Sequence, residues 1–127
     1  IFRALVEATA FGTKAIVDHF INEGVRIDNV IGIGGIALKS PFVIQTLSDV
    51  LNMPIKVCKT DQICALGAAM FAATAAGVYN KVENAIAAMN SGYAKEYIPN
   101  TENTETYTKI YEKYVKVGQF TEKKLFN

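Results

Sequence analysis

The chain has 127 residues, half of them hydrophobic and a fifth charged, with a formal net charge of +1. This length suits one domain with a sizeable core, and the composition is ordinary for a globular cytoplasmic protein. A charge so close to zero argues against nucleic acid or an anionic membrane as a partner. Cys58 and Cys64 have no second pair of ligand residues nearby, so buried, reduced thiols are expected rather than a metal site.

The chain opens with a helical pattern. Residues 2–23 predict a helix with Leu5, Ile16 and Phe20 facing inward, and Gly24 is expected to end it. The first residue is not a natural initiator, and no signal-peptide pattern is visible in the sequence. These features predict that upstream sequence is missing and that the chain is a piece of a larger protein.

Two short apolar runs, 30–33 and 55–58, follow and are typical of strands covered on both faces. Between them, Ser40 is a good N-cap and Pro41 suits the first position of a helix that is expected to run to residue 52. Strand, helix and strand in this order predict a parallel pair of neighbouring strands, and therefore an α/β fold.

Residues 63–79, "ICALGAAMFAATAAGVY", carry no charge. A membrane-spanning helix needs about 20 strongly apolar residues, whereas this stretch is shorter and is mostly alanine and glycine. It therefore predicts a closely packed internal helix, which begins at a cap formed by Thr60 or Asp61 and ends at Gly77.

The C-terminal part differs in character. A short helix is predicted over 82–90, and residues 90–104 are rich in turn formers and are expected to form a loop. A last helix carries Tyr107, Tyr111 and Tyr114 at positions i, i+4 and i+7. Such a stripe predicts the face that packs this helix against the rest of the chain.

The stretch "VIGIGGIALKSPF" (30–42) has the composition of a nucleotide-binding turn. It is not a Walker phosphate loop, because Leu38 and Ile33 occupy the two positions that must be glycine. The dinucleotide pattern GxGxxA is satisfied by Gly32, Gly34 and Ala37. The acidic residue that should follow about 20 positions later is not in place. A dinucleotide-binding oxidoreductase segment stays open as an alternative, which a third parallel strand after residue 77 would favour.

Three stretches resemble the C-terminal end of the FGGY carbohydrate kinases. They are "RALVEATAFGTKAI" (3–16), "GGIALKSPFVIQTLSDVLNMPI" (34–55) and "TDQICALGAAMFAATAAGVY" (60–79). The "ATAFG" helix and one extra residue between Gly35 and Gln45 point to the L-ribulokinase branch of the family. The resemblance implies the C-terminal portion of a ribonuclease H-like domain of the actin and sugar-kinase superfamily, over 1–79, with a helical C-terminal extension, 80–127, packing on it.

The resemblance also implies an ATP-dependent kinase that phosphorylates a ketopentose, L-ribulose. In this family the glycine pair delivers backbone to the adenosine of ATP. A purine or ribose lies flat against backbone only where no Cβ projects. The residues implied to bind the nucleotide are Gly34, Gly35, Ile36, Lys39 and Ser40. The catalytic base, the phosphate loops and the Mg²⁺ contacts are expected in the missing N-terminal part of the same kinase, so the fragment alone is expected to be inactive.

Other polar residues predict structural roles. Asp61 and Gln62 begin the alanine-rich helix, where a helix cap is favoured over a place in the interdomain cleft. Gln45 and Asp49, one turn apart, are interpreted as a solvated helix face. Three further residues have no motif partners, and we expect their side chains to be hydrogen-bonded or to face solvent. These are Arg3, Glu7 and His19.

Two further expectations concern partners. The uncovered apolar faces of a fragment predict that it associates with itself or is less stable than the parent domain. A non-enzymatic module that uses its C-terminal helices for protein contacts is the remaining alternative. Finding no cleft beside Gly34 and Gly35, or an exposed tyrosine stripe, would favour it.

Overall fold

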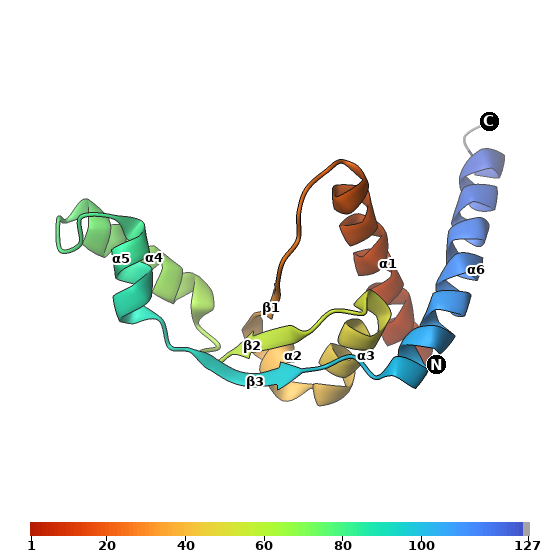
Figure 1. The fold of residues 1–127 in the computed structure, drawn as a ribbon, viewed down its shortest axis with the longest axis horizontal. Helices are drawn as coiled ribbons and strands as arrows, with labels where there is room; N and C mark the ends of the chain where they lie inside the picture. Colours follow the sequence, from red (N-terminus) through yellow and green to blue (C-terminus); the bar gives the residue numbers. More distant parts are fainter. Residues whose placement is uncertain (126–127) are drawn as a thin grey trace. The chain divides into compact units, whose positions relative to one another are not determined.

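The computed structural model describes residues 1–125 as six helices and three short strands (Figure 1). In chain order they are α1 (Phe2–Asn22), β1 (Val30–Gly32), α2 (Gly34–Lys39), α3 (Pro41–Leu51), β2 (Ile55–Cys58), α4 (Ile63–Ala75), α5 (Val82–Met89), β3 (Tyr93–Tyr97) and α6 (Thr101–Leu125).

The three strands form one sheet in the order β1-β2-β3. The prediction that the first two strands are neighbours is confirmed, and α2 and α3 lie in the connection between them. The predicted loop over 90–104 is wrong where β3 forms. The backbone N–H of Lys59, just after β2, donates to the carbonyl of Gly92, just before β3 (3.1 Å). This bond joins the end of β2 to the start of β3, so the two strands are antiparallel, as their arrowheads show in Figure 1.

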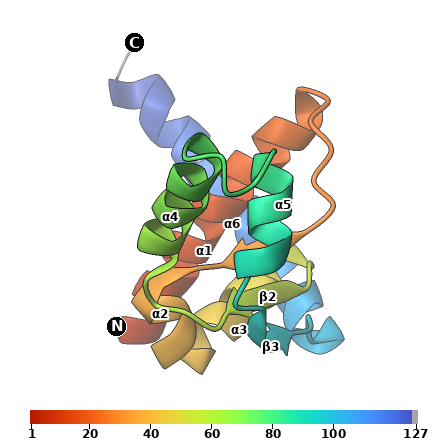
Figure 2. The ribbon, with the colours of Figure 1, turned by 90° about the vertical axis from the view of Figure 1, so that its left-hand side faces the viewer.

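The chain forms two compact units, each assembled from separate segments. One consists of residues 1–30, 42–55 and those from 97 onward, and the other of 31–41 and 56–96. The first unit contains α1, α3 and α6. The second contains α2, α4 and α5 together with most of the sheet. Figure 2 shows α4 and α5 of the second unit side by side.

The core of the first unit is aromatic. Phe11 of α1, 4% exposed, lies against Tyr107, Tyr111 and Tyr114 of α6, with ring centroids 6.0, 6.0 and 5.6 Å away. Tyr107 is buried, Tyr111 is half-buried and Tyr114 is 41% exposed. The prediction that the tyrosine stripe packs α6 down is confirmed.

The predicted inward face of α1 is wrong. Leu5, Ile16 and Phe20 are 64, 59 and 48% exposed, whereas Ala10 and Phe11 are buried. The helix is apolar on more than one side, and the side that α6 covers is the one that carries Phe11. Periodicity identifies apolar positions, but only the tertiary partner decides which of them are buried.

Left-handed glycines explain where two of the helices end. Gly24 and Gly77 follow α1 and α4 with φ of +84° and +75°, as expected for left-handed residues after a helix. The predicted Asp61 cap is wrong, because α4 begins after Gln62 without a side-chain cap. Thr60 instead accepts a hydrogen bond from the backbone N–H of Gln62 (3.1 Å).

Both cysteines are free, but Cys64 is exposed and Cys58 is half-buried, so the expectation of buried thiols is wrong for Cys64. None of the helices within residues 1–125 combines the length and the apolar character that crossing a membrane requires.

Candidate functional site

The chain turns from β1 into α2 at the first glycine of the pair. Ile33 is extended, with φ −125° and ψ 158°, and Gly34 then takes φ +84° as the first residue of α2. A side chain at this φ would be strained, so the turn itself requires glycine at position 34.

Gly35 differs from its neighbour. It lies outside the left-handed region, and a Cβ built on it would meet no atom of the chain within 4 Å. Its backbone is also exposed. Neither conformation nor packing within this chain therefore requires glycine at position 35.

The remaining candidates lie on the same short helix. Ile36 is 68% exposed, Lys39 is exposed and Ser40 is half-buried, while Ala37 is buried at 3% exposure and anchors the helix. The backbone N–H of Ser40 donates to the carbonyl of Ile36 (2.9 Å) and closes α2. The structure thus brings the predicted nucleotide residues together on one turn and one short helix, with Gly35, Ile36 and Lys39 open to solvent.

Sequence reasoning missed α2 itself. Two adjacent glycines are poor helix formers, and the signal of Ser40 and Pro41 pointed to the next helix, which does begin at Pro41. In the structure Ser40 stands between the two helices and follows α2.

A cavity of about 290 Å³ lies elsewhere in the second unit. It is lined by residues of all three strands and of α4 and α5, among them Ile31, Cys58, Met70 and Tyr93. None of the five nucleotide candidates lines it, so they form a surface site rather than part of this mainly apolar cavity.

The other polar candidates separate into exposed and buried groups. Asp61, Gln62 and His19 are exposed. Gln45 and Asp49 have a structural role, as expected, but they do not form a solvated face, since Asp49 is only 2% exposed and accepts a hydrogen bond from the Gln45 amide (2.8 Å). The spacing of one helical turn is typical of a hydrogen bond between the two side chains, but it does not predict that Asp49 is buried.

Arg3 and Glu7 have a partner that the sequence did not reveal. The Arg3 Nε lies 2.7 Å from a Glu7 carboxylate oxygen, and the Tyr107 hydroxyl donates to the same oxygen (3.1 Å). Burial first, and then the Glu7 carboxylate, raise the pKa of Tyr107. Glu7 is thus satisfied, as expected. Within the part of the chain that the structure describes, no group of three His, Cys, Asp or Glu side chains is placed to hold a metal ion.

The family model of the FGGY carbohydrate kinases, C-terminal domain, matches residues 1–76. The chain belongs to the FGGY family of carbohydrate kinases. Among curated relatives of this FGGY chain, a ribulokinase of Vibrio parahaemolyticus is 49% identical over 96% of it, and one of Bacillus licheniformis is 45% identical over 90%. The chain spans 22 and 21% of these two proteins, about a fifth of their length.

Solved structures agree on the fold of this FGGY domain. A xylulose kinase from Rhodospirillum rubrum, 19% identical, covers 98% of the chain with a TM-score of 0.80, and the match takes up 25% of that protein. A Plasmodium falciparum glycerol kinase solved with ADP, 25% identical, covers 91% with a TM-score of 0.71, over 23% of its own chain. The fold is therefore the C-terminal portion of the ribonuclease H-like domain of the actin and sugar-kinase superfamily.

Each of the two alternatives loses a feature that would favour it. The strand that follows residue 77, β3, is antiparallel to β2 and is not the third parallel strand of a dinucleotide-binding sheet. The tyrosine stripe packs on Phe11 rather than standing free, which removes one of the two features that would favour a helical interaction module.

Proposed function

We propose that this chain is the C-terminal part of an ATP-dependent kinase that phosphorylates L-ribulose to L-ribulose 5-phosphate in the cytoplasm. Relatives named ribulokinase, 41 to 49% identical over at least 90% of the chain, support the ketopentose substrate. In this proposal residues 1–79 belong to the nucleotide-binding domain of the kinase, and residues 80–127 are its C-terminal extension.

The site's contribution is to hold adenosine against the backbone of Gly34 and Gly35, bordered by Ile36, Lys39 and Ser40. The open side of Gly35 carries this proposal. The chain does not itself require glycine there, and a flat nucleoside does. The glycerol kinase of similar fold was solved with ADP, which supports a nucleotide as a ligand of the whole kinase.

Phosphoryl transfer is mainly positioning and charge stabilisation around a metal-bound nucleotide, together with a base for the attacking hydroxyl. As the family resemblance implies, the proposal assigns the base, the Mg²⁺ contacts and the phosphate loops to the remaining part of the kinase. In a coupled assay this chain alone would show no turnover of L-ribulose, whereas the full-length kinase would.

The decisive experiment compares Gly35→Val with Lys39→Ala in the full-length kinase. Valine places a branched side chain where the nucleoside should lie, so ATP affinity should fall at least tenfold, about 1.4 kcal/mol. The exposed Lys39 is well solvated, so its replacement should have a smaller effect. L-Ribulose affinity should change little in either variant. Isothermal titration with ATP and with L-ribulose measures both affinities.

Gly118→Val is the matched control, because Gly118 is also a helical glycine with no atom within 4 Å of an added Cβ. It should leave ATP affinity unchanged. Loss of ATP binding in Lys39→Ala with normal binding in Gly35→Val would mean that the turn grips phosphate, and the adenosine assignment would be wrong.

A further inference from the structure

The N-terminus of α6 is held by a buried carboxylate from α3. One oxygen of Asp49 accepts the backbone N–H of Asn100 (2.8 Å), and the other accepts the side-chain amide of Asn103 (2.8 Å). Asn100 in turn caps the helix, since its side-chain oxygen accepts the backbone N–H of Asn103 (3.1 Å). No ion pair among the described residues involves Asp49, so hydrogen-bond donors and the positive end of α6 stabilise its charge.

Neighbouring side chains of α3 bind the backbone that leads into α6. The Gln45 amide donates to the carbonyl of Ile98 (2.9 Å) as well as to Asp49, and the Ser48 hydroxyl lies 3.3 Å from the carbonyl of Tyr97. In the opposite direction, the Thr104 hydroxyl donates to the backbone carbonyl of Asp49 (3.0 Å). α3 therefore forms hydrogen bonds with both side-chain and backbone groups of residues 97–104.

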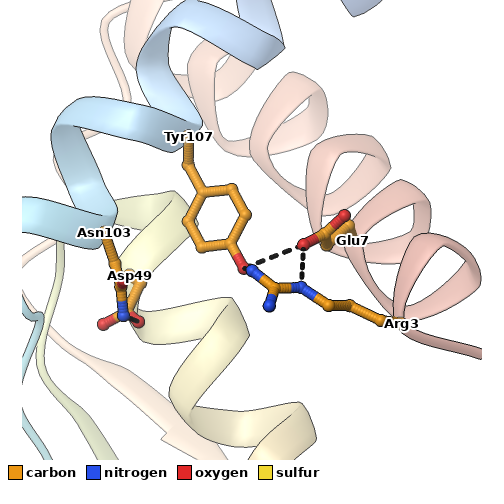
Figure 3. A network of polar contacts seen from close by, with 5 residues as sticks. All are labelled: Arg3, Glu7, Asp49, Asn103 and Tyr107. Atoms are coloured by element: carbon orange, nitrogen blue, oxygen red, sulfur yellow. Dashed lines mark hydrogen bonds and ion pairs between the residues drawn. The ribbon is translucent and has the colours of Figure 1, made fainter.

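A second contact lies on α1, as Figure 3 shows. The Tyr107 hydroxyl, one turn after Asn103, donates to Glu7 (3.1 Å) and lies 3.4 Å from a guanidinium nitrogen of Arg3. The two pairs, Arg3–Glu7 and Gln45–Asp49, thus meet successive turns of the same helix.

The positions of these residues in the sequence suggest their role. All four receptor residues lie inside the stretch that the family model matches, and all the groups that they hold lie beyond it. We propose that Gln45–Asp49 and Arg3–Glu7 form a two-point receptor for α6. The partner that it recognises is a helix N-terminus of the pattern Asn-x-x-Asn-x-x-x-Tyr, here Asn100, Asn103 and Tyr107.

A charge exchange tests this receptor in the full-length polypeptide that carries these residues. Asn103→Asp places a second carboxylate 2.8 Å from an oxygen of Asp49, and two carboxylates that close repel each other. Hydrogen exchange of the peptide spanning 97–107 should become at least about tenfold faster at pH 7, because local opening sets its exchange rate.

Asp49→Asn alone should have little effect, because its side-chain oxygen still accepts from Asn100 and its amide donates to a flipped Asn103. In the double variant Asp49→Asn with Asn103→Asp, slow exchange should return, since one carboxylate again faces amide donors. Asp61→Asn is the control, because it alters an exposed carboxylate that lies just before α4 in the sequence. It should leave the exchange rate of this peptide unchanged.

Unchanged exchange in Asn103→Asp would overturn the proposal, and so would failure of the double variant to restore slow exchange. If Asn103→Asp alone does not fold, the double variant still decides. Wild-type protection in it supports the receptor, and its absence refutes it.

Discussion

Phe11 should be the residue on which the first unit depends most. Its ring is 4% exposed and meets three tyrosine rings of α6, the closest at 5.6 Å. Tyr107 meets it edge-on at 72°, a favourable arrangement for aromatic pairs. Phe11→Ala removes the only side chain of α1 that touches all three tyrosines among the described ring contacts.

Replacing a buried phenylalanine by alanine costs about 3 to 5 kcal/mol of unfolding free energy, from lost burial and the cavity left behind. The lower end is expected here. An apolar groove of about 300 Å³ between α1 and α6 already reaches Phe11, and Tyr114 on its border is 41% exposed. Neighbouring side chains therefore have room to relax into the vacated space. A loss of about 3 kcal/mol is still a large part of a typical stability of about 5 to 15 kcal/mol.

Equilibrium urea unfolding of the chain, followed by far-UV circular dichroism, measures this loss as a lower midpoint with an unchanged slope. Phe71→Ala is the matched control, because Phe71 of α4 is 66% exposed, and it should change stability by less than about 0.5 kcal/mol. A loss below about 1 kcal/mol for Phe11→Ala, or equal losses in both variants, would refute the packing role of the tyrosine stripe.

Two further predictions concern the backbone conformation of the glycine pair and the ionisation of Tyr111. Gly34→Ala should destabilise the chain by about 1 to 2 kcal/mol, the cost of a left-handed non-glycine residue, whereas Gly35→Ala should not destabilise it; urea midpoints compare the two. Burial, followed by the Asp18 carboxylate, raises the pKa of Tyr111 to about 12 from 10.0. Because the folded state disfavours the phenolate, this contribution to stability is complete below pH 10 and is lost as the pH rises toward 12. Absorbance titration should show the late ionisation, and Asp18→Asn should lower that pKa.

The sequence predicted elements whose signals are local. Pro41 begins α3 and Gly77 follows α4, because the restricted φ of proline and the freedom of glycine act wherever the chain places them. β3 escaped prediction because "YAKEY" lies among turn formers, and its strand conformation depends on pairing with β2. That pairing brings together Lys59 and Gly92, which are far apart in sequence.

Burial was harder to predict than secondary structure for the same reason. Leu5 and Phe11 are equally plausible core residues by type, but only Phe11 has α6 beside it. Asp49 reads as an ordinary polar helix residue until residues 97–104 fold over it and supply its donors. In each case the deciding partner lies at least 50 positions away along the chain, where periodicity carries no information.

The glycine pair shows how structure sharpens a motif. From sequence alone, Gly34 and Gly35 are equivalent, and one explanation by turn geometry covers both. The structure separates them, since Gly34 has a φ of +84° and Gly35 lies outside the left-handed region with open space beside it. Turn geometry therefore accounts for the first glycine and leaves the second without a reason inside this chain. A ligand that needs bare backbone supplies that reason, which is why Gly35→Val, and not a change at Gly34, is the substitution that tests nucleotide binding.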